Sequence, residues 1–310
     1  MNQSRSLVSI GIPTYNRPTE LRRTLEGIVG QTYTNLEIII SDNASPSDST
    51  EEVVREFMRG DSRIKYFRQV ENLGALSNFQ FVLDKAVGDF FMWAADDDYR
   101  APTFIEVLVD LLQRHPESAI AFCDFMEVDE HGVKAEGYPH HLPLLRPFSS
   151  ENFQIRILRF FLQLELKGKA NLIYGLVRRE SLSQFDWNKF VNSHGEYGAD
   201  MLFVFSILCK GKLSLSDQLL YRCTVGNKKE YVVALPLSWK DKFAVPFVGL
   251  AKQLIYSVQY LFIATGWARV FLVVIWLIKV IDILGRIFLA TEIRNLYRRI
   301  RREFSTCERS

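Results

Sequence analysis

The chain has 310 residues, of which 48% are hydrophobic and 24% are charged, with a formal net charge of +2. This length suits one large domain, or one domain with a smaller appendage. No basic patch with interleaved aromatic residues occurs in the first two thirds, which argues against nucleic acid as a partner. Four scattered cysteines without metal-ligand spacing, and a polar start that lacks a secretory signal, indicate a cytoplasmic protein.

From Leu7 to Phe125 the chain alternates short apolar runs with segments whose apolar residues recur at helical spacing. The apolar runs predict strands and the segments between them predict helices, the last of which begins near Pro102. The predicted strands are Leu7 to Ile12, Leu36 to Ile40, Ile64 to Phe67, Phe90 to Ala95 and Ala119 to Phe125. Strands that alternate with helices predict an α/β fold with a mainly parallel sheet covered by helices on both faces.

The segment after Phe125 is less regular. Glu127 to Ser150 is rich in Gly, Pro, His and charged residues, and predicts a long loop that faces a substrate. His140 and His141 lie in this loop and are expected to be exposed. The elements predicted next are a helix from about Glu151 to Leu166, a strand from Leu172 to Val177, and a helix that stops at Gly211 before a short strand.

Polar side chains follow three of the predicted strands. Thr14 to Asn16 follow the first strand, Asp42 follows the second, and three adjacent aspartates, Asp96 to Asp98, follow the fourth. Ligands of parallel sheets bind beyond the carboxyl ends of the strands, so we expect these groups to meet at one edge.

The three aspartates repel one another, and their burial is unfavourable without a cation. A hard divalent ion with oxygen ligands removes this conflict and would also bridge the oxygens of a diphosphate. The alternative is a solvated acidic turn or a helix N-cap ahead of Pro102. The other polar strand ends favour the metal site over this alternative.

These motifs together resemble glycosyltransferase family 2. The resemblance runs from about Leu7 to Phe125 in order and spacing, and it is weaker from there to about Arg222. The matching segments are Val8 to Arg17 (VSIGIPTYNR), Ile39 to Ser45 (IISDNAS), Asn72 to Gly74 (NLG) and Gly88 to Asp98. The resemblance implies a GT-A fold, an inverting glycosyltransferase, a nucleotide-diphospho-sugar donor, and Mg²⁺ or Mn²⁺ as the cofactor.

The resemblance also assigns roles to residues at matching positions. The segment that starts at Pro13 matches the part that lines the base and ribose, Asp42 matches an aspartate that hydrogen-bonds the base, and Asn72 lies in a loop beside the donor. The full set expected to bind the donor is Pro13, Thr14, Tyr15, Asn16, Asp42, Asn72, Gly74, Asp96 and Asp97. The alternatives are core packing for Tyr15 and an Asx-turn that closes its own loop for Asp42.

Asp96 and Asp98 match the outer residues of the family's Asp-x-Asp motif and are expected to hold the metal, with Asp98 as the direct ligand. Many members of the family carry an acidic residue where Ala95 stands. The register of the motif is therefore open by one residue, and Asp97 stays in the expected site.

Glu196 to Asp200 (EYGAD) is the second candidate site. Inverting transfer needs a carboxylate base that takes the proton from the acceptor hydroxyl. Asp200 opens an apolar-faced helix and matches the family's acidic residue ahead of such a helix, so we expect Asp200 to be the base and place Glu196 second. The alternative for Asp200 is an ordinary helix N-cap.

The composition changes from about Lys228, and Phe243 to Ala290 is strongly apolar and aromatic. We therefore predict a catalytic domain over residues 1–225 and a helical region over 226–310. Charges interrupt the apolar stretch, and arginines cluster from Arg294 to Arg302. This pattern favours a helix that lies on a membrane surface beside anionic lipid. The alternative is a helical hairpin packed on the catalytic domain or on a second copy in a homodimer.

The sequence thus predicts metal-dependent sugar transfer, with inversion, to an acceptor hydroxyl in cell-surface polysaccharide or lipid-linked glycan synthesis, at the inner face of the cell membrane. One rival is a sugar nucleotidyltransferase. Thr14 to Pro18 disfavour it, because that class places a glycine-rich basic loop there. The other rival is a non-catalytic scaffold that binds nucleotide-sugars, against which the intact aspartates and the candidate base argue.

Overall fold

The computed structural model describes residues 6–129, 132–133, 141–163, 168–182, 187, 198–224, 258–264, 266–278 and 280–281. The chain divides into two compact units, residues 1–232 and residues 233–310. The candidate site residues Thr14, Asp42, Asp96 to Asp98 and Asp200 all belong to the first unit.

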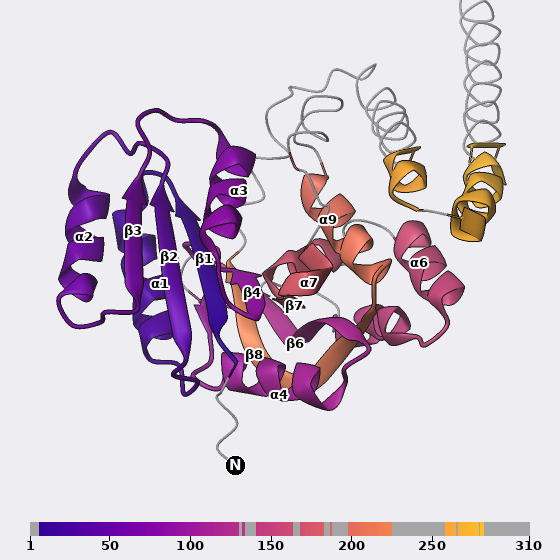
Figure 1. The fold of residues 1–310 in the computed structure, drawn as a ribbon, viewed down its shortest axis with the longest axis horizontal. Helices are drawn as coiled ribbons and strands as arrows, with labels where there is room; N and C mark the ends of the chain where they lie inside the picture. The colour runs from indigo at the N-terminus through magenta and orange to yellow at the C-terminus, as the bar shows by residue number, and fades with distance from the viewer. Residues whose placement is uncertain are drawn as a thin grey trace, which may run out of the picture. The chain divides into compact units, whose positions relative to one another are not determined.

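The first unit is built on an eight-stranded sheet with the strand order β3-β2-β1-β4-β7-β6-β8-β5 (Figure 1). Four strands that run parallel form its first half: β1 (Val8–Thr14), β2 (Leu36–Asp42), β3 (Ile64–Arg68) and β4 (Phe90–Trp93). The other half contains β5 (Tyr99–Arg100), β6 (Ser118–Val128), β7 (Leu176–Arg178) and β8 (Lys212–Thr224). Strand β6 runs parallel to β8, whereas β7 and β5 pair antiparallel with their neighbours.

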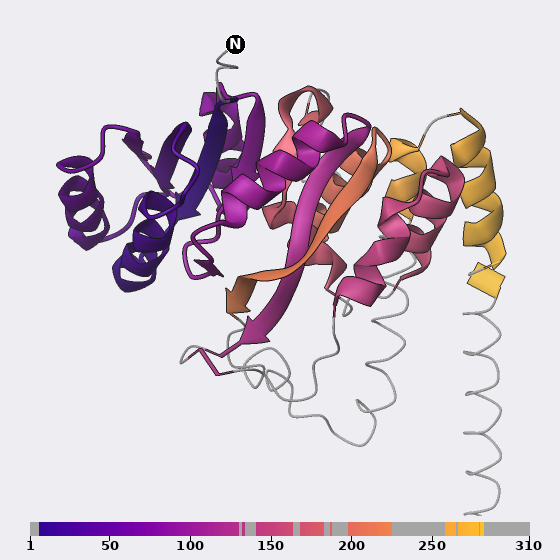
Figure 2. The ribbon, with the colours of Figure 1, turned by 90° about the horizontal axis from the view of Figure 1, so that it is seen from below.

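Helices connect the strands of the first half, which confirms the predicted α/β alternation. They are α1 (Pro18–Val29), α2 (Ser49–Met58) and α3 (Ala75–Lys85), and α4 (Phe104–Arg114) follows between β5 and β6. Helix α3 packs on β1 and β2, and α4 lies across β6 and β8 (Figure 2). The later helical segments are α5 (Leu142–Leu145), η1 (Arg146–Ser149), α6 (Phe153–Leu162), η3 (Lys169–Tyr174), α7 (Arg179–Leu182) and α9 (Ala199–Leu208).

Close packing holds α3 and α9 in place. A Cβ on Gly11 of β1 would lie 2.6 Å from Cγ2 of Val82, so only glycine lets α3 approach the strand this closely. Every residue of α9 except Asp200 is buried, so the helix is apolar all round instead of on one face. The single side chain of α9 that is not buried is therefore the carboxylate of the second candidate site.

Several predicted elements are wrong in detail. Leu172 to Tyr174 lie in the 3-10 helix η3, which packs against α9, and only the end of the predicted segment, Leu176 and Val177, lies in a strand, β7. The predicted loop from Glu127 is shorter than expected, since β6 continues to Val128 and residues 142–149 are helical. Residues 130–131 and 134–140 lie outside the described part. Strand β8 has 13 residues instead of being short.

The second unit is helical over residues 258–263 and 266–278. Within the described stretches of the chain, no helix combines the length and the apolar character needed to cross a bilayer.

Candidate functional site

The carboxyl ends of β1, β2 and β4 meet at one edge of the sheet, as the sequence predicted. Thr14 of β1 pairs with Asp42 of β2. Just after β4, the backbone N–H of Ala94 donates to the carbonyl of Gly11 in β1 at 2.9 Å. The chain that leaves β4 therefore passes beside the end of β1. The Oγ1 hydroxyl of Thr14 donates to Oδ2 of Asp96 at 2.7 Å, which joins the first and third polar segments directly.

Asp96 and Asp97 converge on one cation, the Arg17 guanidinium. Nη1 of Arg17 lies 3.3 Å from Oδ1 of Asp96 and 2.8 Å from Oδ2 of Asp97. Asp96 is buried, and this burial, reinforced by the charge of Asp97, raises the pKa of Asp96 to about 6. The Thr14 hydroxyl and Arg17 oppose the shift but do not cancel it.

Asp98 points the other way, toward β8. Its Oδ2 accepts from the Tyr221 hydroxyl and its Oδ1 from the backbone N–H of Thr224 at 2.9 Å. The Thr224 hydroxyl also donates to the Asp97 carbonyl at 2.7 Å. Burial raises the pKa of Asp98 to about 6 against the opposing charge of Arg100. The aspartate segment is thus fixed on one side by β1 and on the other by β8.

A divalent cation fits this set of groups. Three carboxylates are adjacent, and two of them are buried with raised pKa values, so Arg17 beside Asp96 and Arg100 near Asp98 offset their negative charge only in part. Among the residues described, no three His, Cys, Asp or Glu side chains already form a metal cluster. Mg²⁺ in such sites usually takes one or two carboxylates and completes its shell with substrate phosphates and water. Asp96 to Asp98 offer oxygen ligands of that type.

Asp42 reaches the same edge, but its carboxylate turns into the protein. Oδ1 accepts from the backbone N–H and hydroxyl of Ser45 at 2.8 and 2.6 Å, and Oδ2 accepts from the Tyr66 hydroxyl at 2.9 Å. Burial and the charge of Asp42 raise the pKa of Tyr66. Asp42 therefore closes its own loop, in agreement with the alternative interpretation from the sequence.

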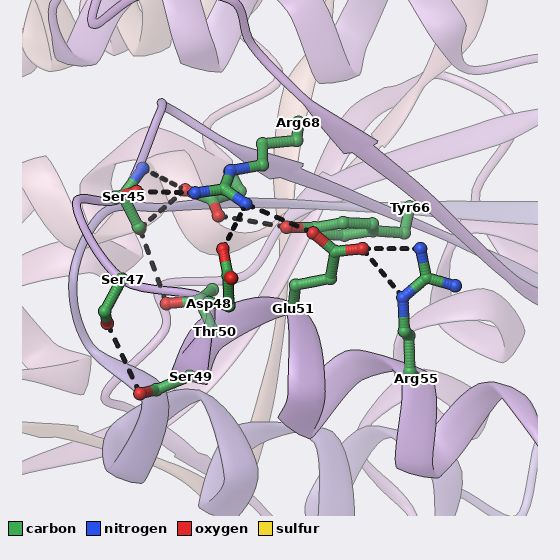
Figure 3. Close-up of polar contacts among 10 residues, drawn as sticks. Ser45, Ser47, Asp48, Ser49, Thr50, Glu51, Arg55, Tyr66 and Arg68 are labelled. Carbon is green, nitrogen blue, oxygen red and sulfur yellow. Dashed lines mark hydrogen bonds and ion pairs between the residues drawn. The ribbon is translucent and has the colours of Figure 1, made fainter.

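The loop that Asp42 closes supports the loop after β1. The Ser45 hydroxyl accepts the backbone N–H of Asn16 at 2.8 Å. Arg68 of β3 donates to the Ser45 carbonyl at 2.9 Å (Figure 3). Asn16 and Ala44 both have left-handed backbones, with φ of 56° and 61°. This conformation is unfavourable for alanine and is tolerated better by asparagine, so the hydrogen bonds of this network help to hold the Ala44 backbone in this shape.

A cavity of about 300 Å³ lies beside these loops. Its lining residues are Pro13, Thr14, Tyr15, Arg17, Asn43, Asn72, Ala75, Asn78, Phe79 and Asp96. Asn72 is held there by Asn43, whose Nδ2 donates to Oδ1 of Asn72 at 2.9 Å. Gly74 is the N-cap of α3 and has a φ of 86°. Tyr15 is 44% exposed, so the core-packing interpretation of this residue is wrong.

A second cavity of about 330 Å³ adjoins the first. Its lining residues are Ala75, Leu76, Phe79, Ala170, Asn171, Ile173, Tyr174, Trp187, Gly198, Ala199 and Asp200. Ala75 and Phe79 belong to both cavities. Asp200 occupies the first turn of α9, where its Oδ1 accepts the Met201 N–H at 2.8 Å. The N-cap is Gly198, so the interpretation of Asp200 as the N-cap is wrong.

Tyr174 is influenced by the charges of both the aspartate segment and Asp200. Burial and the negative charges of Asp98 and, to a smaller extent, Asp200 raise the pKa of its hydroxyl well above the ordinary value. Tyr174 thus lies within electrostatic reach of both carboxylates. Glu196, the second choice for the base, lies outside the described residues.

The sequence did not indicate the position of some other residues around the candidate site. Tyr221 and Thr224 hold Asp98 from the far end of the sheet, and no local pattern marks them. His141 was expected to be exposed, but it is buried and its ring stacks on Phe125 at a centroid distance of 4.1 Å. The composition of the predicted loop did not indicate that His141, just before α5, would pack against β6. His140 lies outside the described part.

Known proteins resemble this chain in sequence over part of its length. A protein of Rickettsia typhi (strain ATCC VR-144 / Wilmington) named Uncharacterized glycosyltransferase RT0329 is 30% identical over 160 residues, 50% of this chain and 46% of that protein. A Campylobacter jejuni protein (subsp. jejuni serotype O:2) named GalNAc(5)-diNAcBac-PP-undecaprenol beta-1,3-glucosyltransferase is 40% identical over 92 residues, 29% of each chain. The chain spans less than half the length of these curated relatives.

The fold is also similar to that of solved structures. The crystal structure of residues 1–349 of S. aureus TarS in complex with UDP-GlcNAc matches with a TM-score of 0.54 and 18% identity, over 80% of this chain and 66% of that one. The mixed, mainly parallel sheet covered by helices is GT-A-like, as predicted. The family model for Glycosyl transferase family 2 matches residues 9–171, more than half of the chain. The chain therefore belongs to glycosyltransferase family 2.

Proposed function

We propose that the chain transfers a sugar, with inversion, from a nucleotide-diphospho-sugar to an acceptor hydroxyl, with Mg²⁺ or Mn²⁺ at the aspartates. The observation that carries this proposal is the arrangement of the two cavities. One is lined by Asp96, the other by Asp200, and they share Ala75 and Phe79. A donor in the first cavity and an acceptor in the second would meet at that shared wall.

The first cavity suits the nucleotide end of the donor. Tyr15 and Asn72 line this cavity and could contact a base and ribose, and Asn16 is exposed next to Tyr15. Asp96 and Asp98 would hold the metal, with Asp97 beside them, and a bound metal would offset the charge of the departing diphosphate. Asp42, whose carboxylate is buried, contributes by supporting Asn16 through Ser45.

The second cavity suits the acceptor. Asp200 would accept the proton of the attacking hydroxyl, because it is the one side chain of α9 that is not buried and it lines this cavity. The aromatic rings of Phe79 and Tyr174 also line the cavity, and such rings pack well on the apolar face of a sugar. A glycan or lipid-linked glycan is therefore the proposed acceptor class.

We place this reaction at the inner face of the cell membrane. In the helix at residues 266–278, Trp267, Val270 and Val274 are 83%, 54% and 51% exposed, at spacings of three and four residues. The arginines from Arg294 to Arg302 follow in the sequence and would attract anionic lipid. The full chain should sediment with anionic vesicles and less with neutral ones, and Trp267→Asp should weaken this. Dimerisation of the full chain without vesicle binding would favour a homodimer instead.

A thermal-shift panel of UDP-, GDP- and dTDP-sugars with Mn²⁺ tests the proposed donor. A ligand at about 100 times its Kd stabilises a folded protein by about 2.7 kcal/mol, so the right donor should raise Tm by several degrees. Asp98→Ala should abolish this shift. Asp110→Asn, an exposed control on α4, should keep it. No shift with any nucleotide-sugar would contradict the proposed function.

A further inference from the structure

Arg17 occupies an unusual position in the candidate site. It lies at the N-cap of α1, lines the donor cavity together with Thr14 and Asp96, and its side chain is 52% exposed. Its Nη1 contacts a carboxylate oxygen of Asp96 and one of Asp97. One nitrogen of an exposed side chain therefore serves both carboxylates.

This geometry differs from that of a structural ion pair between an arginine and a single carboxylate. Arg22, one turn further along α1, forms a two-pronged pair with Glu56, in which Nη1 and Nη2 each meet one oxygen at 2.9 and 2.6 Å. Arg17 uses one nitrogen only. Among the described residues, the structure gives Nε and Nη2 of Arg17 no hydrogen-bond acceptor. Arg17 thus acts on the aspartates as a positive charge and keeps other donors available.

The positive charge of Arg17 lies where the aspartates need a cation. Asp96 is buried and next to Asp97, and the two carboxylates approach the same nitrogen. A divalent ion bound to Asp96 would bring a second cation next to the guanidinium, and like charges at such distances repel. The metal and Arg17 therefore compete for Asp96.

We propose that Arg17 is a built-in counter-cation that closes the aspartate site until a metal and a nucleoside diphosphate enter together. It rests on the proposed function, since it presumes a metal–diphosphate site at the aspartates. When the pair binds, the guanidinium leaves Asp96 and Asp97 and turns its free donors to the diphosphate oxygens. The diphosphate oxygens then accept hydrogen bonds from the displaced guanidinium. Metal alone would displace the guanidinium without giving it a new anionic partner. Metal and nucleotide consequently bind with positive coupling.

Titration of the full chain with Mn²⁺, followed by calorimetry and by the EPR signal of free Mn²⁺, tests this inference. Each protein is titrated with Mn²⁺ alone and with Mn²⁺ plus UDP or GDP. The wild type should bind Mn²⁺ alone weakly and bind it at least about tenfold more tightly with the matching nucleoside diphosphate. Arg17→Gln and Arg17→Met, two neutral variants, should bind Mn²⁺ alone about tenfold more tightly than the wild type and lose most of the coupling.

Two controls separate charge from structure. Arg17→Lys keeps the positive charge and should stay close to the wild type for Mn²⁺ alone. Arg22→Gln removes an exposed ion pair on the same helix and should change neither affinity. Melting temperatures without metal show whether the variants fold. The two neutral variants should be less stable than the wild type without metal, because the aspartates lose their counter-charge, and Mn²⁺ should restore this stability.

The outcomes distinguish this inference from the proposed function. If the wild type binds Mn²⁺ with a nucleoside diphosphate but the neutral variants bind Mn²⁺ alone no more tightly than the wild type, the counter-cation role is wrong and the proposed function stands. If no protein binds Mn²⁺ under any condition, both are wrong.

Discussion

Replacement of Asp98 by Asn should stabilise the protein at neutral pH in the absence of divalent metal. Asp98 is buried and its carboxylate carries a pKa of about 6, above the ordinary value of 3.8. The folded state therefore disfavours the charged form relative to the unfolded chain. An amide of the same shape removes that charge. It can keep its oxygen on the Thr224 N–H, and the Tyr221 hydroxyl can rotate to accept from its nitrogen.

The magnitude follows from the two pKa values. A group whose folded pKa is raised loses stability as pH rises from its unfolded pKa to its folded pKa. Two pKa units correspond to roughly 2 to 3 kcal/mol above about pH 7, and to less than about 1 kcal/mol near pH 4. Asp98→Asn should thus exceed the wild type in unfolding free energy by roughly 2 kcal/mol at about pH 7.5, and this advantage should shrink toward pH 4.

Urea denaturation of both proteins with EDTA across this pH range measures the difference. The exposed control Asp110→Asn should show no such pH-dependent gain. Mn²⁺ added together with the matching nucleoside diphosphate should stabilise the wild type and leave Asp98→Asn unchanged, because a ligand that binds only the folded state adds stability. A variant that is equally or less stable at neutral pH, or a difference that does not change with pH, would refute the reasoning.

Three further substitutions test other parts of the site. Asp200→Asn removes the proposed base but keeps its shape, so the transfer rate should fall about 10²- to 10⁴-fold while donor titration shows unchanged affinity. Ser45→Ala leaves the Asn16 N–H without its acceptor. The KM for the donor should rise several-fold and urea denaturation should show a loss of about 1 to 2 kcal/mol. Gly11→Ala places a methyl group 2.6 Å from Val82 and should cost about 1 to 3 kcal/mol in the same assay.

Each of these changes has a matched control. Asp217→Asn, exposed on β8 and paired with Arg146, should leave the transfer rate as it is. Ser47→Ala, in the same loop as Ser45 but exposed, should leave the donor KM as it is. Val82→Ala combined with Gly11→Ala should recover part of the lost stability. An unchanged rate for Asp200→Asn would contradict the role of Asp200 as the base. An unchanged KM for Ser45→Ala would contradict the support of Asn16 by Ser45, and a Gly11→Ala protein of wild-type stability would contradict the close packing of α3 on β1.

The first half of the sheet was predictable because its strands are marked locally. The runs that end at Thr14, Asp42 and Trp93 are mainly apolar and buried, so these strands and their common edge follow from the sequence. The second half was not predictable to the same degree. The two-residue strand β5 exists only because Tyr99 pairs with Arg222, far along the chain, and neither residue carries a local signal for this pairing.

The site shows the same limit. The contact between Thr14 and Asp96 follows from two adjacent strand ends, and the sequence indicated it. The orientation of Asp42 depends on Tyr66 in a neighbouring strand, and that of Asp98 depends on Tyr221 in β8. The register between β6 and β8 shifts within this region, so no spacing in the sequence places Tyr221 opposite Asp98.

The measurement that tests the central claim most directly is turnover of the nucleotide-sugar identified in the thermal-shift panel, by hydrolysis or transfer. It is measured with Mn²⁺ and with EDTA, for the wild type and for Asp98→Ala. If the aspartates hold the catalytic metal, EDTA should abolish the wild-type activity and Mn²⁺ should restore it. Asp98→Ala should be inactive both with Mn²⁺ and with EDTA. Activity that is indifferent both to chelation and to Asp98→Ala would contradict this claim.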